Sequence, residues 1–495
     1  ALDSNVHFVF TQKFETPEQI KQYDDFMQEL ALLVGRKFGG SLKAEHGTGR
    51  NMAPFVPIEW GEDAYDVMKQ IKDLFDPFNL LNPGVIINQN PRAHLENLKI
   101  LPKTNELIDM CIECGFCESV CPSNMLSLTP RQRIVANRAM ALKNADELRT
   151  LKKSYHYDGL QTCAACSLCF MRCPVGINMG NATKYLRSQE ANLANKALAS
   201  FIARNYALIL RFARASLWLV DTLASVNERW FKAIAKTLHK CGLPLWNASL
   251  PSKAPKIPSN EFKSLSGEKV VYFSSCINQT MANPKEKANE KSIQEVVLSV
   301  LNKAGIEVII AGEDKCCGMP FYSKGYKSAG DAKSHQLREE LRRASEDGTL
   351  DIICDMSPCT KTMLEHLGDE FRIFASDEYV AKIAHKLQFT QTNEPIVIHK
   401  TCSSQTSGRA QFIEELARKC SSNVAVPKNV TCCGFAGDKG FTHPELNKVA
   451  LRHLKPQIQT NARGFSTSKT CEIGLSEHSG IGYRHILYLV DECTA

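Results

Sequence analysis

The sequence lacks three features that would direct its interpretation at once. No run among its 495 residues is long and apolar enough for a membrane span, because the most apolar stretch, 201–220, contains Arg204, Arg211 and Arg214. No basic run with interleaved aromatic residues accompanies the net charge of +7, so we expect no nucleic-acid partner. No G-x-G-x-x-G opens a βαβ unit, which argues against a nicotinamide cofactor.

The composition is that of an ordinary globular protein, with 43% hydrophobic and 23% charged residues, and the length predicts about three domains. The 20 cysteines gather in clusters typical of metal ligands, which indicates a reducing, cytoplasmic compartment. A helix over 201–220 would either pack between domains or lie peripherally on the inner face of the cytoplasmic membrane, with Trp218 and Trp230 at the interface. The chain begins inside an expected strand, so we expect it to be the C-terminal part of a longer protein.

The strongest signal is one cysteine spacing that occurs twice, C-x2-C-x2-C-x3-C-P. Zinc motifs pair C-x2-C units across a longer gap, and disulfide frameworks suit short secreted domains, so the spacing predicts two [4Fe–4S] clusters as in bacterial ferredoxins. Three thiolates on one loop bind one cluster, while the fourth, before the proline, binds the other. The predicted ligands of one cluster are Cys111, Cys114, Cys117 and Cys173, and those of the other are Cys163, Cys166, Cys169 and Cys121.

The C-terminal part contains a divergent repeat. Strands over 269–275 and 395–401 deliver Cys276 and Cys402, and each is followed by a helix and a Cys-Cys-Gly, which predicts two related α/β halves. Convergent thiolates form a soft-metal pocket, whose occupant (an iron–sulfur centre, a simpler metal or none) stays open. The candidate ligands are Cys276, Cys316, Cys317, Cys354 and Cys359 in the first copy and Cys402, Cys432, Cys433 and Cys471, with His399 as a further candidate, in the second.

This repeat resembles the cysteine-rich CCG domain of heterodisulfide reductases and of the iron–sulfur parts of glycolate oxidase and D-lactate dehydrogenases. In that family the usual order is Cys, then Cys-Cys-Gly, then Cys-x2-Cys. The first copy departs from it with Cys354-x4-Cys359. In the second copy Gly474 stands three residues after Cys471, so we expect that copy to lack its last cysteine.

The first 90 residues predict a small α+β unit, with strands over 5–11 and 85–87 and helices after Thr16-Pro17 and over 62–75. Its S-L-K-A-E-H-G-T-G-R segment (41–50) and D-P-x4-N-P-G segment (76–84) resemble the C-terminal cap of FAD-linked 2-hydroxy-acid dehydrogenases of the vanillyl-alcohol-oxidase superfamily. The resemblance implies FAD, held mainly by an upstream domain with a contribution from Asn82. It also implies a substrate-binding divalent metal on His7 and Glu45, and His46 as the base that removes the 2-hydroxyl proton.

The order of parts resembles a fused D-lactate dehydrogenase. That resemblance implies oxidation of D-lactate to pyruvate, with electrons passing through FAD and the clusters to quinone or a cytochrome. D-2-hydroxyglutarate as substrate, an electron-transfer subunit without its own substrate site, and thiol–disulfide chemistry stay open. The expected fold is multidomain. It comprises an α+β cap fragment (1–92), an all-α helical ferredoxin domain with a long helix over 131–151 (97–200), a helical connector without site residues (201–260) and an α/β duplicated CCG domain (268–495).

Overall fold

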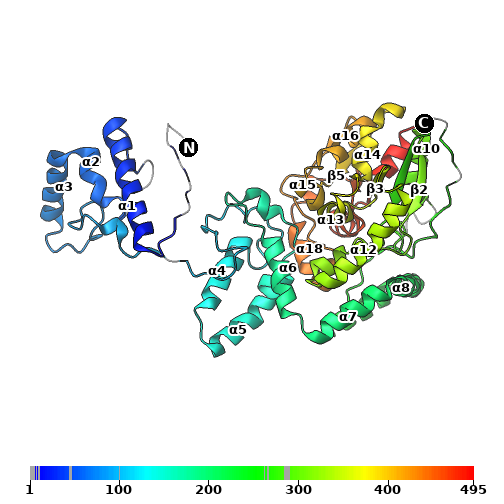
Figure 1. Cartoon of the computed structure of the whole chain (residues 1–495), viewed down its shortest axis with the longest axis horizontal. Helices are drawn as coiled ribbons and strands as arrows, with labels where there is room; N and C mark the ends of the chain where they lie inside the picture. Colours follow the sequence, from blue (N-terminus) through cyan, green and yellow to red (C-terminus); the bar gives the residue numbers. More distant parts are fainter. Residues whose placement is uncertain are drawn as a thin grey trace. The chain divides into compact units, whose positions relative to one another are not determined.

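The computed structural model divides the chain into two compact units, 1–103 and 104–495, each of which is described by itself (Figure 1). The description covers residues 6, 8, 10, 12–43, 47–99, 101–260, 262–264, 267–283 and 290–495.

The first unit is built from short helices around a small core of Tyr23, Met27, Ala31 and Phe55. The Thr16 hydroxyl caps α1 by accepting a hydrogen bond from the backbone N–H of Gln19, and Pro17 occupies the first helical position, as predicted. The helix predicted over 62–75 is confirmed as α3. The helices are α1 (Pro17–Ala31), η1 (Leu32–Lys37), η2 (Ala53–Phe55), α2 (Val56–Trp60), α3 (Glu62–Phe75) and η3 (Ala93–Leu95).

The strand predicted over 85–87 is wrong. Ile86 has a φ of 63°, and the backbone N–H of Ile87 donates to the carbonyl of Val85, so the segment folds as a tight turn. The described residues of this unit offer no neighbouring strand for it to pair with. The strand predicted over 5–11 lies largely outside the described residues, and residues 6, 8 and 10 are not in a strand.

The second unit begins with a helical module that carries the eight predicted cluster cysteines. The single helix predicted over 131–151 is wrong, because the chain breaks at 142–144. Asn144 there caps a new helix by accepting from the backbone N–H of Glu147. The elements are α4 (Pro130–Ala141), α5 (Ala145–Tyr155), η4 (His156–Gln161), η5 (Leu168–Arg172) and α6 (Met179–Glu190).

Three helices follow, α7 (Leu193–Arg204), α8 (Tyr206–Val226) and α9 (Glu228–Lys240), and we call them the connector. Of the helices that the structure describes, none combines the length and the apolar character that crossing a bilayer requires. Ala199, Ala203, Tyr206 and Leu210 of the connector are buried in one cluster with Cys276, Cys316 and Phe321. The connector therefore packs against the first half of the repeat.

The repeat forms two four-stranded parallel sheets of the same topology. The strand order is β2-β1-β3-β4 in the first half and β6-β5-β7-β8 in the second, so the predicted duplication is confirmed. The strands of the first half are β1 (Lys269–Phe273), β2 (Glu307–Ala311), β3 (Asp351–Cys354) and β4 (Ile373–Ala375). Those of the second are β5 (Ile396–Ile398), β6 (Val424–Ala425), β7 (Arg463–Ser466) and β8 (Tyr483–His485).

Helices cover both sheets and join the two halves through a shared core. Tyr272 of β1 and Phe465 of β7 belong to one buried cluster, together with side chains of α10, α14, α16 and α20. The helices of the first half are α10 (Ile293–Lys303), α11 (Met319–Ser323), α12 (Lys327–Ala344), α13 (Ser357–Leu367), α14 (Ser376–Lys382) and η7 (Ala384–Lys386). Those of the second are α15 (Cys402–Thr406), α16 (Gln411–Cys420), α17 (Lys439–Thr442), α18 (Pro444–Ala450), η8 (Lys455–Gln457), α19 (Lys469–Ser479) and α20 (Ile486–Glu492).

Candidate iron–sulfur sites

The first predicted cysteine group lines one small cavity. Cys111, Cys114 and Cys117 come from the loop before α4, and Cys173 reaches the same cavity from the end of η5. Ile134, Ile177 and Met179 form an apolar wall around them. The cysteine that is distant in sequence therefore joins the loop as the spacing predicts.

The second group is Cys121 together with Cys163, Cys166 and Cys169. The Cys121 thiol lies close enough to Cys163 and Cys166 for their charges to raise its pKa further, beyond the larger effect of burial. After the larger effect of burial, the charges of Cys121, Cys163 and Cys166 likewise raise the pKa of Cys169. Cys169 also lines the cavity of the first group, so the two groups adjoin there, and the exchange of the fourth ligands between the motifs stays a prediction.

The two loops share a backbone conformation. Glu113 and Ala165, each two residues after the first cysteine of its motif, have φ values of 60° and 49°. Their N–H groups donate to the Sγ atoms of Cys111 and Cys163, both at 3.4 Å. Hydrogen bonds to sulfur stabilise the negative charge of metal-bound thiolates. Both loops therefore fit an anionic iron–sulfur cluster.

A buried arginine accompanies each group, and neither was predicted from the sequence. Arg133 donates to the carbonyl of Gly159 at 2.7 Å and to the hydroxyl of Ser123 at 3.0 Å, and its Nη1 lies 3.8 Å from the Cys121 Sγ. Arg138 donates to the carbonyl of Cys111 at 2.9 Å and pairs with Glu113 at 2.8 Å. Both guanidinium groups offset the charge that thiolates bring into a buried site.

Burial opposes thiolate formation in the absence of a bound group. It raises the pKa of Cys117 to about 11 and that of Cys169 to about 12. For Cys163 the charges of Arg133 and Arg187 outweigh burial, so its pKa is lowered. Binding of iron must therefore displace protons from several of these thiols.

The two halves of the repeat each place four equivalent cysteines at the carboxyl edge of their sheet. Cys276 and Cys402 follow β1 and β5, and the Cys-Cys pairs follow β2 and β6. Cys359 and Cys471 occupy the third positions of α13 and α19, the helices that follow β3 and β7. Because all strands are parallel, these ends meet at one edge of each sheet.

Cys471 of the second copy is the counterpart of Cys359, while Gly474 stands where the usual Cys-x2-Cys has its second cysteine. Cys354 ends β3 beside Ala375 of β4, and the position in β7 that pairs with β8 in the same way is Ser466. Cys354 is therefore an additional cysteine of the first copy, while Cys471 corresponds to Cys359.

The first-copy thiols are fully buried and in mutual contact. Hydrogen bonds from the thiols of Cys276 and Cys317 lower the pKa of Cys316, which lies between them. The backbone N–H of Gly318 also donates to the Cys316 Sγ, at 3.4 Å. Cys359 contacts both Cys317 and Cys354, which brings all five candidate ligands together.

The connector contributes a residue to this site, contrary to the expectation that it carries none. The Tyr206 hydroxyl contacts the thiols of Cys276 and Cys316, and burial raises the pKa of this phenol. The Lys333 Nζ lies 4.8 Å from the centre of the Tyr206 ring. Tyr206 lay within an apolar helical run, and no local sequence signal marked it.

The second-copy thiols form a similar group. The Sγ atoms of Cys433 and Cys471 are 3.0 Å apart, and the backbone N–H of Gly434 donates to the Cys432 Sγ at 3.4 Å. Hydrogen bonds from Cys432 and Cys471 lower the pKa of Cys433. The buried His399 ring contacts the Ser466 hydroxyl through Nδ1, and its Nε2 has no hydrogen-bond partner within the described part of the chain. Burial lowers the pKa of this imidazole.

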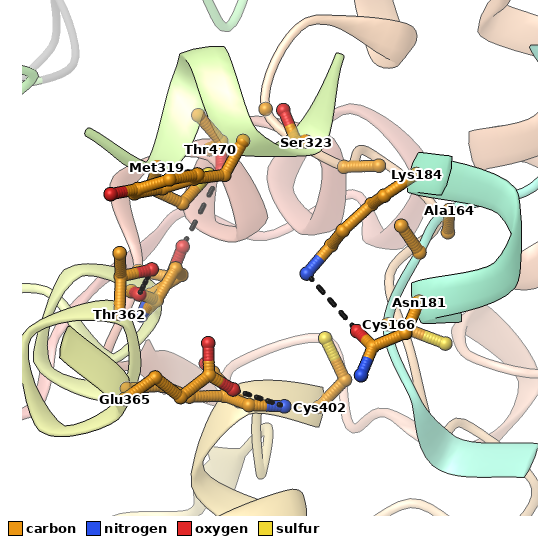
Figure 2. A pocket seen from close by; sticks show the side chains of 18 of the residues that line it. Ala164, Cys166, Asn181, Lys184, Met319, Ser323, Thr362, Glu365, Cys402 and Thr470 are labelled. Atoms are coloured by element: carbon orange, nitrogen blue, oxygen red, sulfur yellow. Dashed lines mark hydrogen bonds and ion pairs between the residues drawn. The ribbon is translucent and has the colours of Figure 1, made fainter. Parts of the chain in front are cut away.

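This second copy adjoins the helical module. A hydrogen bond between Cys166 and Cys432 lowers the pKa of Cys166, so the second cluster group and the second copy are in direct contact. Both face a pocket of about 480 Å³, with Cys402, Cys433 and Cys471 in its wall. Figure 2 shows Cys166 and Cys402 on walls formed by different segments, with Lys184 directed into the space and hydrogen-bonded to Asn181.

Within the part of the chain that the structure describes, no three His, Cys, Asp or Glu side chains converge tightly enough for a single metal ion. A zinc site requires several ligands at bonding distance from one ion. The ligands of a cubane each bind a different iron, so they surround a larger space.

The predicted catalytic segment is not part of this description. His7, Glu45 and His46 lie outside the described residues. Asn82 is exposed on a turn with a φ of 45°, after a loop that the Asp76 carboxylate holds by accepting from the backbone N–H groups of Leu80 and Leu81.

Three domain families match successive parts of the sequence. Residues 1–86 match the C-terminal domain of FAD-linked oxidases, and residues 107–177 match the 4Fe-4S dicluster domain. Residues 270–365 and 396–476 match the cysteine-rich domain called CCG. The chain therefore combines a segment similar to the C-terminal domain of FAD-linked oxidases, a 4Fe-4S dicluster domain and a CCG domain. The finer domain boundaries stay predictions.

Its relatives include subunits of two oxidoreductases and a dehydrogenase about twice as long as the part that matches. The glycolate oxidase iron-sulfur subunit of Escherichia coli (strain K12) is 24% identical over 79% of this chain and 95% of its own length. A subunit of anaerobic glycerol-3-phosphate dehydrogenase from the same strain is 20% identical over 78% of this chain and 98% of its own. D-2-hydroxyglutarate dehydrogenase of Pantoea ananatis (strain AJ13355) is 21% identical over 95% of this chain and 53% of its own.

Proposed function

We propose that this chain is the C-terminal portion of a flavin- and iron–sulfur-dependent dehydrogenase that oxidises a D-2-hydroxy acid, with D-lactate as the substrate and pyruvate as the product. The observation that carries the proposal is the presence on one chain of an FAD-linked oxidase segment and of two cysteine groups, the second of which contacts the second CCG copy. Electrons would leave to quinone or a cytochrome, in a protein of the cytoplasm or of the inner face of its membrane.

In this proposal different residues serve the substrate, the metal and the clusters. Bound FAD would take the hydride equivalent of the substrate, and bound clusters would carry single electrons away. His46 is the base that removes the 2-hydroxyl proton, while His7 and Glu45 hold a divalent cation at the substrate. Arg133 and Arg138 supply positive charge beside the two thiolate groups.

The first unit also offers a surface for the FAD-binding partner domain. Leu74, Phe75, Phe78, Leu80 and Leu81 are each more than two-thirds exposed, in and just after α3. A contiguous run of exposed apolar side chains is typical of a surface that another domain covers. In this proposal the FAD-binding domain covers it.

A second candidate function is an electron-transfer subunit without its own substrate site. It is favoured by the match to 95% of the glycolate oxidase iron-sulfur subunit. The FAD-linked oxidase segment, 1–86, distinguishes the two candidates, because an electron-transfer subunit would not need it.

The test uses the complete protein with its FAD-binding domain, loaded anaerobically with FAD and iron. We expect dye reduction with D-lactate in preference to glycolate and D-2-hydroxyglutarate. His46→Asn should lower kcat by about 100-fold or more, because a general base is lost, without changing the iron content. The matched control is His453→Asn, at an exposed position.

Dye reduction by D-2-hydroxyglutarate but not by D-lactate would overturn the substrate assignment. Full activity in His46→Asn would overturn the assigned base. If no 2-hydroxy acid reduces the dye while iron and FAD are bound, the electron-transfer subunit is the correct function.

A further inference from the structure

Helix α8 exposes an apolar stripe on the side that faces away from the repeat. Its members recur at steps of four, seven, four and three residues, which places them on one helical face. They range from 47% to 82% exposed. We call this set the connector face, and it consists of Leu208, Phe212, Leu219, Leu223 and Val226.

The opposite side of the same helix is buried in the protein. Tyr206, Leu210 and Ala224 lie there, the first two against Cys276 and Cys316. Helix α8 is therefore apolar on two sides, of which only one is needed for packing within the unit. In Figure 1 α7 and α8 lie at the lower edge of the second unit, with α8 seen nearly end-on. Exposed apolar surface of this extent marks a contact with something outside the unit.

Positive charge surrounds the connector face. Residues 193–243 contain eight basic side chains (Lys196, Arg204, Arg211, Arg214, Arg229, Lys232, Lys236 and Lys240) against two acidic ones (Asp221 and Glu228). Trp218 and Trp230 are also more than half exposed, and the Lys253 Nζ lies 5.8 Å from the centre of the Trp218 ring. Apolar stripes, interfacial tryptophans and flanking basic residues together are typical of helices that lie on anionic membranes.

We propose that the connector face docks α8, with α9 beside it, flat on a bilayer that contains anionic lipid. The basic residues near the connector face complement anionic lipid headgroups. A surface that receives another protein domain does not require this excess of positive charge, so we assign the face to lipid. The helices would lie in the interface, in agreement with the lack of a spanning helix among those described.

This docking has a consequence for the first CCG copy. Tyr206 contacts Cys276 and Cys316 from the buried side of α8. The thickness of one helix, about 10–12 Å, would then separate that thiol group from the lipid. If the proposed function holds, the first copy is the centre nearest to an acceptor dissolved in the membrane. The binding itself does not depend on that function.

The experiment is sedimentation of the iron-loaded full chain with vesicles of phosphatidylcholine alone and of phosphatidylcholine mixed with phosphatidylglycerol. We expect binding to the mixed vesicles that weakens as salt is raised. Phe212→Glu with Leu219→Glu should reduce the partition coefficient by about tenfold or more, because charged side chains replace apolar ones in the interface. The control is Leu142→Glu, which is more exposed than either residue and lies in the helical module.

Absence of binding to either vesicle would overturn the proposal. So would equal loss of binding in Leu142→Glu, or a dimer in solution that the double variant dissociates, since the connector face would then join two copies of the chain. Far-ultraviolet circular dichroism and iron content distinguish misfolded variants. Dye reduction by the substrate, which needs no membrane, tests the proposed function separately.

Discussion

Arg133 and Arg138 lie about one and a half helical turns apart on α4, and each serves a different cysteine group. Replacing Arg133 with Met would leave the Gly159 carbonyl and two hydroxyls without their donor and would remove a positive charge beside Cys121. We expect a loss of about 3 kcal/mol of stability and preferential loss of the second cluster. Iron content and the EPR spectrum of the reduced protein measure both.

Arg138→Met is the matched control for this prediction. It should affect the first cluster instead, because Arg138 contacts the Cys111 carbonyl and Glu113. Equal loss of both clusters in both variants would show that the arginines support the fold of the module rather than the individual sites.

His485 predicts a pH dependence of stability. Burial lowers its pKa to about 3, and its Nδ1 accepts a hydrogen bond from the backbone N–H of Leu487. Since the unfolded chain binds this proton near pH 6.5 and the folded chain does not, stability falls as the pH drops from about 6.5 towards 3, by up to about 1.4 kcal/mol per pH unit.

His485→Asn keeps an acceptor for Leu487 but does not titrate. The difference in unfolding free energy between the wild type and this variant should change steadily over that pH range, as followed by denaturant unfolding. The exposed His453→Asn should show a flat difference. A flat difference for His485→Asn as well would contradict a neutral, buried imidazole.

The sequence predicts a site residue only where the site fixes the spacing of its residues along the chain. Thiol ligands are recognisable because a cluster fixes their spacing along the chain, as for Cys111 to Cys121. Arg133, Arg138 and Tyr206 act through tertiary proximity, and helix periodicity does not distinguish a buried arginine from a solvated one. His399 was marked only by its place before Cys402.

At the scale of elements, the Cys-Cys-Gly turns depend on a backbone that only glycine adopts easily. Gly434 has a φ of 72°, and a Cβ there would lie 2.8 Å from the Leu446 carbonyl oxygen and from the Ala450 methyl group. Gly434→Ala should therefore cost about 2 kcal/mol or more and disturb the loop that carries Cys432 and Cys433.

Gly408→Ala is the control, because Gly408 has nearly the same φ, 71°, with no atom within 4 Å of the added Cβ. It should cost only the conformational penalty, about 1 kcal/mol. Denaturant unfolding measures both variants. Equal losses would show that crowding at the second copy contributes nothing.

The elements that the sequence predicted well are those with local signals at both ends. Helix α3 and the cap of α1 followed from Thr16-Pro17, the apolar spacing and Asp76-Pro77. The break at Asn144 was missed because the apolar pattern continues through it. The turn at 85–87 was taken for a strand because short β-branched runs carry no information about a pairing partner.

At the scale of the whole molecule, the contacts show which cysteine sites of the second unit are neighbours. The second cysteine group adjoins the second CCG copy through Cys166 and Cys432, whereas the first copy faces the connector through Tyr206. The sequence predicted the order of domains along the chain. It could not predict which copy adjoins the helical module, because that depends on how α6 and the connector pack on the two sheets.

The central claim is that eight cysteines bind two clusters with their fourth ligands exchanged between motifs. The most direct measurement is the iron content and EPR spectrum of the anaerobically purified, reduced chain, comparing Cys173→Ser with Cys121→Ser. We predict about eight irons in the helical module of the wild type, and loss of a different cluster signal in each variant. Zinc in place of iron, or loss of the same signal in both variants, would contradict the account.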